Sequence, residues 1–200
     1  MFQLSPATEL YRALPKTALY EKFNLVGARQ RQFEADVSKM ILVHRIDAET
    51  IPAVQCGKEV ESIWVLAVTL KHRNYNPKNI IMLQKMIPQN IVFALQHEDK
   101  TQLCIFHTRL QQSAWMPTDE AVIPLQGLNL DDVWGNIVAS IGSLDASSEE
   151  TIEQQIINRE QKEKLLRQIE VLEKKCRLEK QTHKKYELHQ DLIKLKSLIQ

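Results

Sequence analysis

The last fifty residues constrain the fold most, because residues 151–200 contain neither glycine nor proline. A segment without these helix breakers, whose apolar residues recur at helical spacing, is typical of a long amphipathic helix. The recurrence is four, three and four residues in two stretches, which are Leu165, Ile169, Leu172 and Cys176, and then Leu188, Leu192, Leu195 and Ile199. The pattern predicts a coiled coil whose interface is formed by the seven aliphatic residues of these stretches.

The two stretches do not share one register. Continuing the first register would place Glu179, His183 and Gln190 at core positions. The apolar seam therefore breaks between Glu179 and Tyr186, either at a stutter in one helix or at the tip of a helical hairpin. A single helix of this length would span about 75 Å, so we expect it to fold back or to be covered by another chain.

A small, polar segment precedes the tail and predicts a boundary. We divide the chain into a domain over residues 1–142, a linker over 143–150 and the coiled-coil tail over 151–200. Ser147 or Ser148, followed by acidic residues, is a suitable helix start.

Residues 1–142 predict a mixed α/β (α+β) domain, because strand and helix patterns alternate along them. Apolar runs predict strands over 40–46 and 63–71, a hairpin over 91–97 and 101–110, and a short strand over 122–125. Residues 1–39 are predicted to be helical, and further helices are predicted over 78–87 and up to residue 141. Residues 63–68 are apolar without alternation, which indicates a strand that is buried on both faces.

The bulk composition favours a reducing, cytoplasmic setting. The three cysteines are odd in number and far apart, which argues against a disulfide framework. The N-terminus lacks the pattern of a signal peptide, and no apolar run is long enough to span a bilayer. The chain has 26 basic and 25 acidic residues. The tail over 151–200 holds 12 basic and 8 acidic residues, so it is mildly basic. Residues 1–150 hold the other 14 basic and 17 acidic residues, so the domain is mildly acidic.

Motifs for catalysis are missing from the sequence. It contains no Gly-rich phosphate loop, no H-E-x-x-H, no C-x-x-C and no G-x-S-x-G. The six histidines show no spacing typical of metal ligands, so we expect neither a metal nor another cofactor. These observations argue against an enzyme.

One constellation nevertheless leaves a nuclease open as an alternative. Nucleases of the restriction-endonuclease fold carry an acidic residue on one strand and a Glu-x-Lys triplet on the next, followed by a helix and a strand. Here Thr69-Leu70-Lys71 ends a strand, the following elements have the expected order, and Asp47 ends the preceding strand. Thr69 stands where the carboxylate belongs, and a hydroxyl is a poor ligand for Mg²⁺. The alternative is an active or degenerate nuclease with Asp47 and Lys71 in its site.

A basic cluster in the tail is the candidate for contact with nucleic acid. It comprises Lys174, Lys175, Arg177, Lys180, Lys184 and Lys185. Such a stripe suits backbone phosphates, although lysines also cover the solvated faces of most coiled coils. In the domain, Trp64, Trp115 and Trp134 are expected to pack in the core or at its rim. Trp115, beside Met116-Pro117 in a predicted loop, is expected to be the most exposed of the three and could anchor a partner.

Several segments resemble a bacterial domain-of-unknown-function family of small proteins that end in a coiled coil. They are Leu14-Pro15-Lys16, Leu19-Tyr20-Glu21-Lys22, Ala48-Glu49-Thr50-Ile51, Gly127-Leu128-Asn129-Leu130-Asp131 and, most specifically, Glu179-Lys180-Gln181 with Lys184-Lys185 and Glu187-Leu188. The tail departs from the family pattern at Thr182-His183 and at His189. The resemblance implies no catalytic residue.

The resemblance also implies a context, because such proteins are often encoded near helicases and DNA methyltransferases in phage-defence clusters. We therefore expect a non-enzymatic interaction subunit of a DNA-processing or restriction-like assembly. Its protein partner is expected to be a helicase or a DNA methyltransferase, and a homodimer through the tail is a further possibility. Nucleic-acid contact stays open, and no membrane partner is expected.

Overall fold

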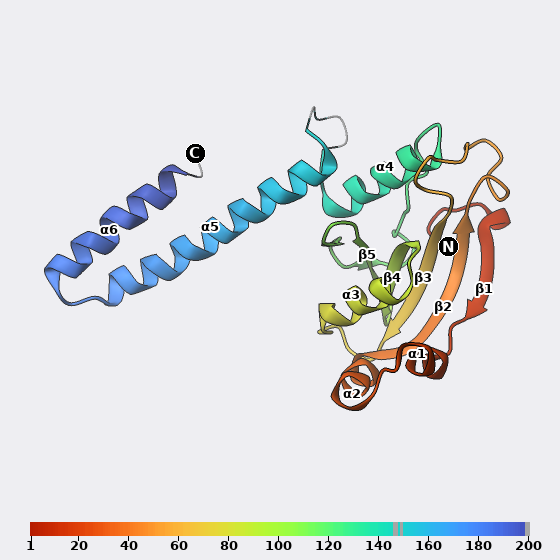
Figure 1. Ribbon diagram of the computed structural model, residues 1–200, viewed down its shortest axis with the longest axis horizontal. Helices are drawn as coiled ribbons and strands as arrows, with labels where there is room; N and C mark the ends of the chain where they lie inside the picture. Colours follow the sequence, from red (N-terminus) through yellow and green to blue (C-terminus); the bar gives the residue numbers. More distant parts are fainter. Residues whose placement is uncertain (146–147, 149, 199–200) are drawn as a thin grey trace. The chain divides into compact units, whose positions relative to one another are not determined.

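The computed structural model describes residues 1–145, 148 and 150–198. Two compact units make up the chain, Met1–Ser148 and Glu149–Gln200. The first unit is the mixed α/β body and the second consists of helices (Figure 1). No described helix is both long enough and apolar enough to cross a membrane.

A mixed seven-stranded sheet forms the centre of the first unit. Its strands are β1 (Glu9–Ala13), β2 (Val37–Ile46), β3 (Ile63–Leu70), β4 (Asn90–His97), β5 (Lys100–Phe106), β6 (Leu110–Gln112) and β7 (Met116–Pro117). The order is β1-β2-β3-β4-β5-β6, with β7 also paired to β5. Only the pair β3–β4 is parallel, and the helix α3 (Pro77–Met86) connects these two strands, as parallel pairing requires a crossover.

Three helices pack on one face of this sheet and share its core. They are α1 (Lys16–Phe23), α2 (Gly27–Asp36) and α3. Their apolar side chains share one buried cluster with Leu66, Val68 and Leu70 of β3. Val65 and Ala67, which point to the opposite face by strand alternation, are buried as well. The prediction that this strand is buried on both faces is thus confirmed.

A fourth helix, α4 (Leu130–Gly142), contacts β5 and β6. Its N-cap is Asn129, whose side-chain oxygen accepts a hydrogen bond from the backbone N–H of Asp132 at 3.0 Å. This cap satisfies one of the free N–H groups at the helix start. The helix buries an apolar stripe that includes Val133 and Ile137.

The N-terminal prediction was wrong in part. Residues 1–39 contain a short 3-10 helix (Pro6–Thr8) and the strand β1 before the two helices. The second helix ends at Asp36 rather than at residue 39, because β2 already begins at Val37. β1 pairs with β2 through an irregular register, with Tyr11 at a left-handed φ of 44°, and such a short, bulged edge strand has no clear alternation.

Two further predictions for the body differ from the structure. Residues 122–125 form no strand; the short strands after β5 are β6 and β7. The segment predicted as one strand over 101–110 is interrupted, with β5 ending at Phe106 and β6 beginning at Leu110. The predicted hairpin exists, and it turns through Glu98, whose φ is 54°.

The second unit is a pair of helices rather than one continuous helix. α5 spans Ile152–Leu178, and α6 spans Thr182–Ser197. The break falls at residues 179–181, inside the range that the register change predicts. The helix does not begin at a serine: Thr151 is the N-cap of α5 and accepts from the backbone N–H of Gln154 at 3.2 Å, Ser148 is not helical, and Ser147 lies outside the described residues.

Candidate functional site

The carboxylate of Asp36, a residue that is only 6% exposed, contacts donors from three residues of the body. One carboxylate oxygen lies 2.9 Å from Nε2 of His72. The other accepts from the backbone N–H of Asn76 at 2.8 Å and from the side-chain amide of Asn79 at 2.7 Å. Both oxygens therefore have protein donors, as a buried carboxylate requires.

The sheet topology explains why these residues meet. β2 and β3 are antiparallel, so the start of β2 lies beside the end of β3. The backbone N–H of Lys71 accordingly donates to the carbonyl oxygen of Asp36 at 2.8 Å. Asn76 is the N-cap of α3. Asp36 thus joins the start of β2, the end of β3 and the start of α3.

His72 is the member of this group that solvent can reach, because its side chain is 49% exposed while that of Asp36 is 9% exposed. A carboxylate that holds a histidine ring in place is an arrangement used in general acid–base catalysis. The groups bonded to Asp36 include no hydroxyl or thiol nucleophile. The contacts of Asp36 account for a structural connection and do not define a reaction.

The nuclease alternative placed Asp47 beside Lys71, and the structure does not bring them together. Ile46 pairs with Ile63 and Val37 pairs with Leu70, so Asp47 and Lys71 lie at opposite ends of the two strands, about 25 Å apart. Asp47 instead forms an ion pair with Arg45 at 2.6 Å and accepts from the backbone N–H of Thr50 at 2.9 Å. Sequence reasoning missed Asp36, although antiparallel pairing of consecutive strands would have indicated it.

The residues at the end of β3 do not fit a catalytic Mg²⁺. Both oxygens of Asp36 are engaged by donors, and Thr69 supplies no carboxylate. Among the described residues, no group of three His, Cys, Asp or Glu side chains is placed to hold a metal ion. Mg²⁺ in proteins is bound mainly by carboxylate and water oxygens, so we derive no metal-assisted step.

Cys104 is the buried thiol of the chain, and its surroundings make it unreactive. Burial raises its pKa to about 12, which leaves almost no thiolate at neutral pH. Its sulfur lies 3.7 Å from the hydroxyl of Tyr75, which donates to Gln102 at 2.9 Å. Burial raises the pKa of Tyr75 as well. This group is a packed polar contact and not a nucleophile.

His44 is the other buried titratable group, with a fully buried ring. Its Nδ1 lies 2.9 Å from the hydroxyl of Thr8, while its Nε2 has no hydrogen-bond partner among the described residues. Burial lowers its pKa below the ordinary 6.5, the N-terminal amino group acts in the same direction, and Glu9 opposes them. The ring is therefore neutral in the folded chain at neutral pH.

We expect His44 to make the body less stable in mild acid. Below pH 6.5 the unfolded chain binds a proton at His44 and the folded chain does not, so stability falls as pH decreases, by up to about 1.4 kcal/mol per pH unit. Urea unfolding of the wild type and of His44→Leu at pH 7.5 and 5 measures this. The variant should lose much of the pH dependence, whereas His97→Gln should keep it. An unchanged dependence in His44→Leu would contradict the assignment.

The predicted coiled-coil interface residues lie along the two helices of the second unit, which contact each other. Ile169 of α5 and Leu192 of α6 are both 7% exposed. The flanking residues Leu165, Leu172, Leu188 and Leu195 are half-buried, and Ile199 lies outside the described residues. Lys196 and Glu173 form an ion pair between the helices at 2.8 Å. The hairpin thus uses its central residues internally and leaves the flanking leucines partly open.

An apolar groove runs along this hairpin. Its floor is formed by Val171 and Leu172 of α5 and Leu195 of α6, and Lys164, Arg167 and Gln168 form its rim. Val171 is 54% exposed. We call this surface the hairpin groove.

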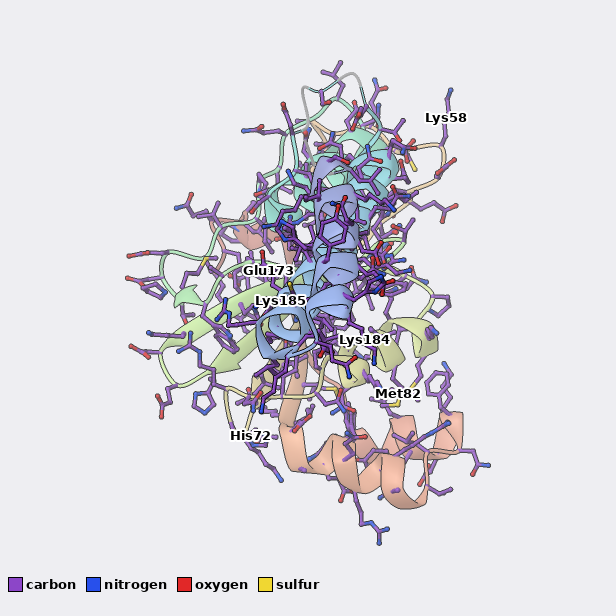
Figure 2. All side chains as sticks on the ribbon, turned by 90° about the vertical axis from the view of Figure 1, so that its left-hand side faces the viewer. Lys58, His72, Met82, Glu173, Lys184 and Lys185 are labelled. Atoms are coloured by element: carbon purple, nitrogen blue, oxygen red, sulfur yellow. The ribbon has the colours of Figure 1, made fainter. Side chains whose placement is uncertain are left out.

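The basic cluster lies around the turn between α5 and α6. Lys174, Lys175 and Arg177 belong to the end of α5, Lys180 to the turn, and Lys184 and Lys185 to the start of α6. Figure 2 labels Lys184 and Lys185. All six residues are exposed. Lys174 forms an ion pair with Glu170 at 2.8 Å. Lys175 and Arg177 lie in the last turn of α5, where positive charge is favourable for the helix itself.

Trp115 is half-buried and packs against the core of the body. The guanidinium of Arg73 lies 5.4 Å from the centre of its ring. Trp115 is thus a partly exposed residue at the rim of the core, and a role as a partner anchor stays a prediction.

Comparison with known proteins gives one match. The model of a family described as a domain of unknown function (DUF4391) matches residues 2–198. No curated protein and no solved structure matches the chain.

Proposed function

The chain belongs to the DUF4391 family of unknown function, and from its own residues we propose that it is a non-enzymatic interaction subunit. The observation that carries the proposal is the hairpin groove, where Val171, Leu172 and Leu195 are left open on a helix pair. Two helices alone bury little apolar surface, and bundles gain stability when further helices cover it.

We propose that a second copy of the chain covers the hairpin groove, giving a four-helix coiled-coil bundle. Acidic and basic residues are interspersed along α5, as the ion pairs Arg159–Glu163 and Lys174–Glu170 within the helix illustrate. An antiparallel copy can therefore place unlike charges opposite each other. Twofold dimers are also the commonest closed assembly.

The wider role that we propose is accessory to a bacterial, cytoplasmic DNA-processing or phage-defence assembly, with a helicase or a DNA methyltransferase as the larger partner. Support for this context comes from the family resemblance. The engagement of both Asp36 oxygens supports a binding role for the body over a nuclease. The basic cluster around residues 174–185 supplies charges suited to nucleic-acid phosphates.

Light scattering of the full chain tests the dimer. We expect the mass of two copies for the wild type and of one copy for the double variant Val171→Glu, Leu195→Glu, because carboxylates in the groove floor would be desolvated on pairing. The matched control is Tyr186→Glu, which changes an exposed apolar side chain of α6 outside the groove and should remain dimeric. Circular dichroism verifies that the variants keep their helices.

A monomeric wild type, or a dimer that survives both substitutions, would contradict the proposed pairing. If the wild type is monomeric, the hairpin groove would instead be covered by another protein. Binding to the helicase or methyltransferase, with the same variants, then becomes the relevant measurement.

A further inference from the structure

A second groove lies on the α/β unit, between α2 and α3. Its floor consists of Phe23, Ile81, Met82 and Met86, all half-buried. Phe23, Met82 and Met86 rest on the buried core of the body, which fixes the floor. Figure 2 shows Met82 on α3. We call this surface the α2–α3 groove.

The rim of the α2–α3 groove is basic. Arg29 and Gln32 contribute from α2, and Lys78 and Lys85 from α3. The three cations are exposed, and none forms an ion pair within the described part of the chain. Among the residues that the structure describes, none that lines the groove is acidic. Asn79 also lines it, and the carboxylate that Asn79 binds, Asp36, is buried with both oxygens engaged.

The spacing along α3 arranges these side chains on one helix face. Lys78, Ile81, Met82, Lys85 and Met86 recur at intervals of three and four residues, so they share one stripe. Ile80 and Leu83, on the other side of the helix, are fully buried in the core. α3 therefore buries Ile80 and Leu83 completely and leaves Ile81, Met82 and Met86 partly open to solvent.

From this pairing of an apolar floor with a cationic rim, we propose that the α2–α3 groove binds an acidic amphipathic helix of a partner protein. Apolar side chains of that helix lie on the floor, and its carboxylates face Arg29, Lys78 and Lys85. Methionines suit such a floor because their flexible thioethers adapt to different side chains. The ten residues of α3 form a helix of about 15 Å, so roughly three turns of a partner helix fit along it.

The floor favours a protein helix over nucleic acid as the occupant. Cations alone would suit phosphates equally well, but bases stack on aromatic rings. Phe23 is the sole aromatic residue of the groove lining, and Lys22 already lies over its ring at 5.4 Å. The proposal concerns a surface of the body and does not depend on dimerisation through the hairpin groove.

Fluorescence anisotropy with a designed peptide tests the proposal on the full chain. The probe is a labelled helical peptide of about fourteen residues, ~20 Å long, with leucines along one face and glutamates elsewhere. We expect saturable binding, weakened about tenfold in the double variant Lys78→Glu, Lys85→Glu and also weakened in Met82→Ser. The matched control Arg12→Glu, Lys100→Glu makes the same charge change at exposed positions outside the groove and should bind as the wild type does.

Several results would overturn the proposal. One is the absence of saturation at about 1 mM protein. Another is equal binding of a scrambled peptide of the same composition, because attraction by charge alone does not need an apolar face. A third result concerns a labelled DNA duplex or RNA. If the wild type binds this nucleic acid but not the peptide, and the double variant Lys78→Glu, Lys85→Glu loses the nucleic-acid binding, the groove is assigned to nucleic acid. Thermal unfolding of each variant establishes that it is folded.

Discussion

Replacing Asp36 with alanine is expected to lower the free energy of unfolding of the α/β unit by about 3 kcal/mol. The carboxylate accepts from His72, from the backbone N–H of Asn76 and from the amide of Asn79. Asn79 is itself 4% exposed, so its amide would be left buried without this acceptor. The loss also disconnects α3 from the paired ends of β2 and β3. Urea unfolding, followed by tryptophan fluorescence, measures the change.

Two further variants distinguish the loss of these buried hydrogen bonds from a general effect of removing an acidic side chain. Asp36→Asn keeps one acceptor oxygen for Asn76 and Asn79, and His72 can accept from the new amide, so we expect a smaller loss of about 1 kcal/mol. Asp119→Ala removes an exposed aspartate and should change stability by less than about 0.5 kcal/mol. Equal stability of Asp36→Ala and Asp119→Ala would show that the buried hydrogen bonds do not hold these elements together.

Asp36 also shows where reasoning from the sequence reached its limit. The pattern around it continues that of a helix, with Phe33, Val37 and Met40 at helical spacing. The structure ends the helix at Asp36 and buries Val37 and Met40 from a strand. Periodicity cannot separate these cases in a segment of a few residues, because sheet pairing and not local preference decides the outcome.

Elements with strong local signals were predicted well. The strand predicted over 63–71 spans Ile63–Leu70, and the helix predicted over 78–87 spans Pro77–Met86 with Asn76 as its cap. Both have a long apolar pattern bounded by clear stop signals. β1, β6 and β7 were missed because they are short edge strands whose pairing comes from neighbours distant in sequence.

In the tail, too, the local sequence predicts the helices, whereas the pairing of the helices is not evident from it. The absence of glycine and proline predicts helix, and the register change predicts a break, which falls at residues 179–181. Of the groove floor, Leu172 and Leu195 belong to the predicted seam, whereas Val171 lies outside it. Only the pairing of α5 with α6 determines which side chains stay open. That a coiled coil forms with a second copy stays a prediction.

The loop between β2 and β3 carries the second large expected effect. The side chain of Asp131, near the start of α4, accepts from the backbone N–H groups of Lys58 at 2.7 Å, Glu59 at 3.2 Å and Val60 at 2.8 Å. These hydrogen bonds lower the pKa of the carboxyl group. Gly57 lies against this contact: a Cβ added there would lie only 2.6 Å from Cγ of Asp131 and 2.8 Å from the carbonyl oxygen of Val60.

Gly57→Ala is therefore expected to destabilise the body by about 2 kcal/mol, because the methyl group displaces the Asp131 carboxylate or shifts the backbone at Val60. Asp131→Ala should destabilise it at neutral pH and have no effect well below pH 3.8, since a carboxyl with a lowered pKa stabilises only while it is ionised.

The double variant Gly57→Ala, Asp131→Ala tests whether the two residues act through one contact. In urea unfolding, the double variant should lose less free energy of unfolding than the sum of the two single variants. The reason is that each substitution alone already disrupts the same contact between the loop and the Asp131 carboxylate. Full additivity would contradict the shared contact and leave the backbone at Val60 as the sole obstacle. In the sequence, Cys56-Gly57-Lys58 is an ordinary turn signal. In the structure, Gly57 is required because the carboxylate of Asp131, more than seventy residues away in the chain, approaches it closely.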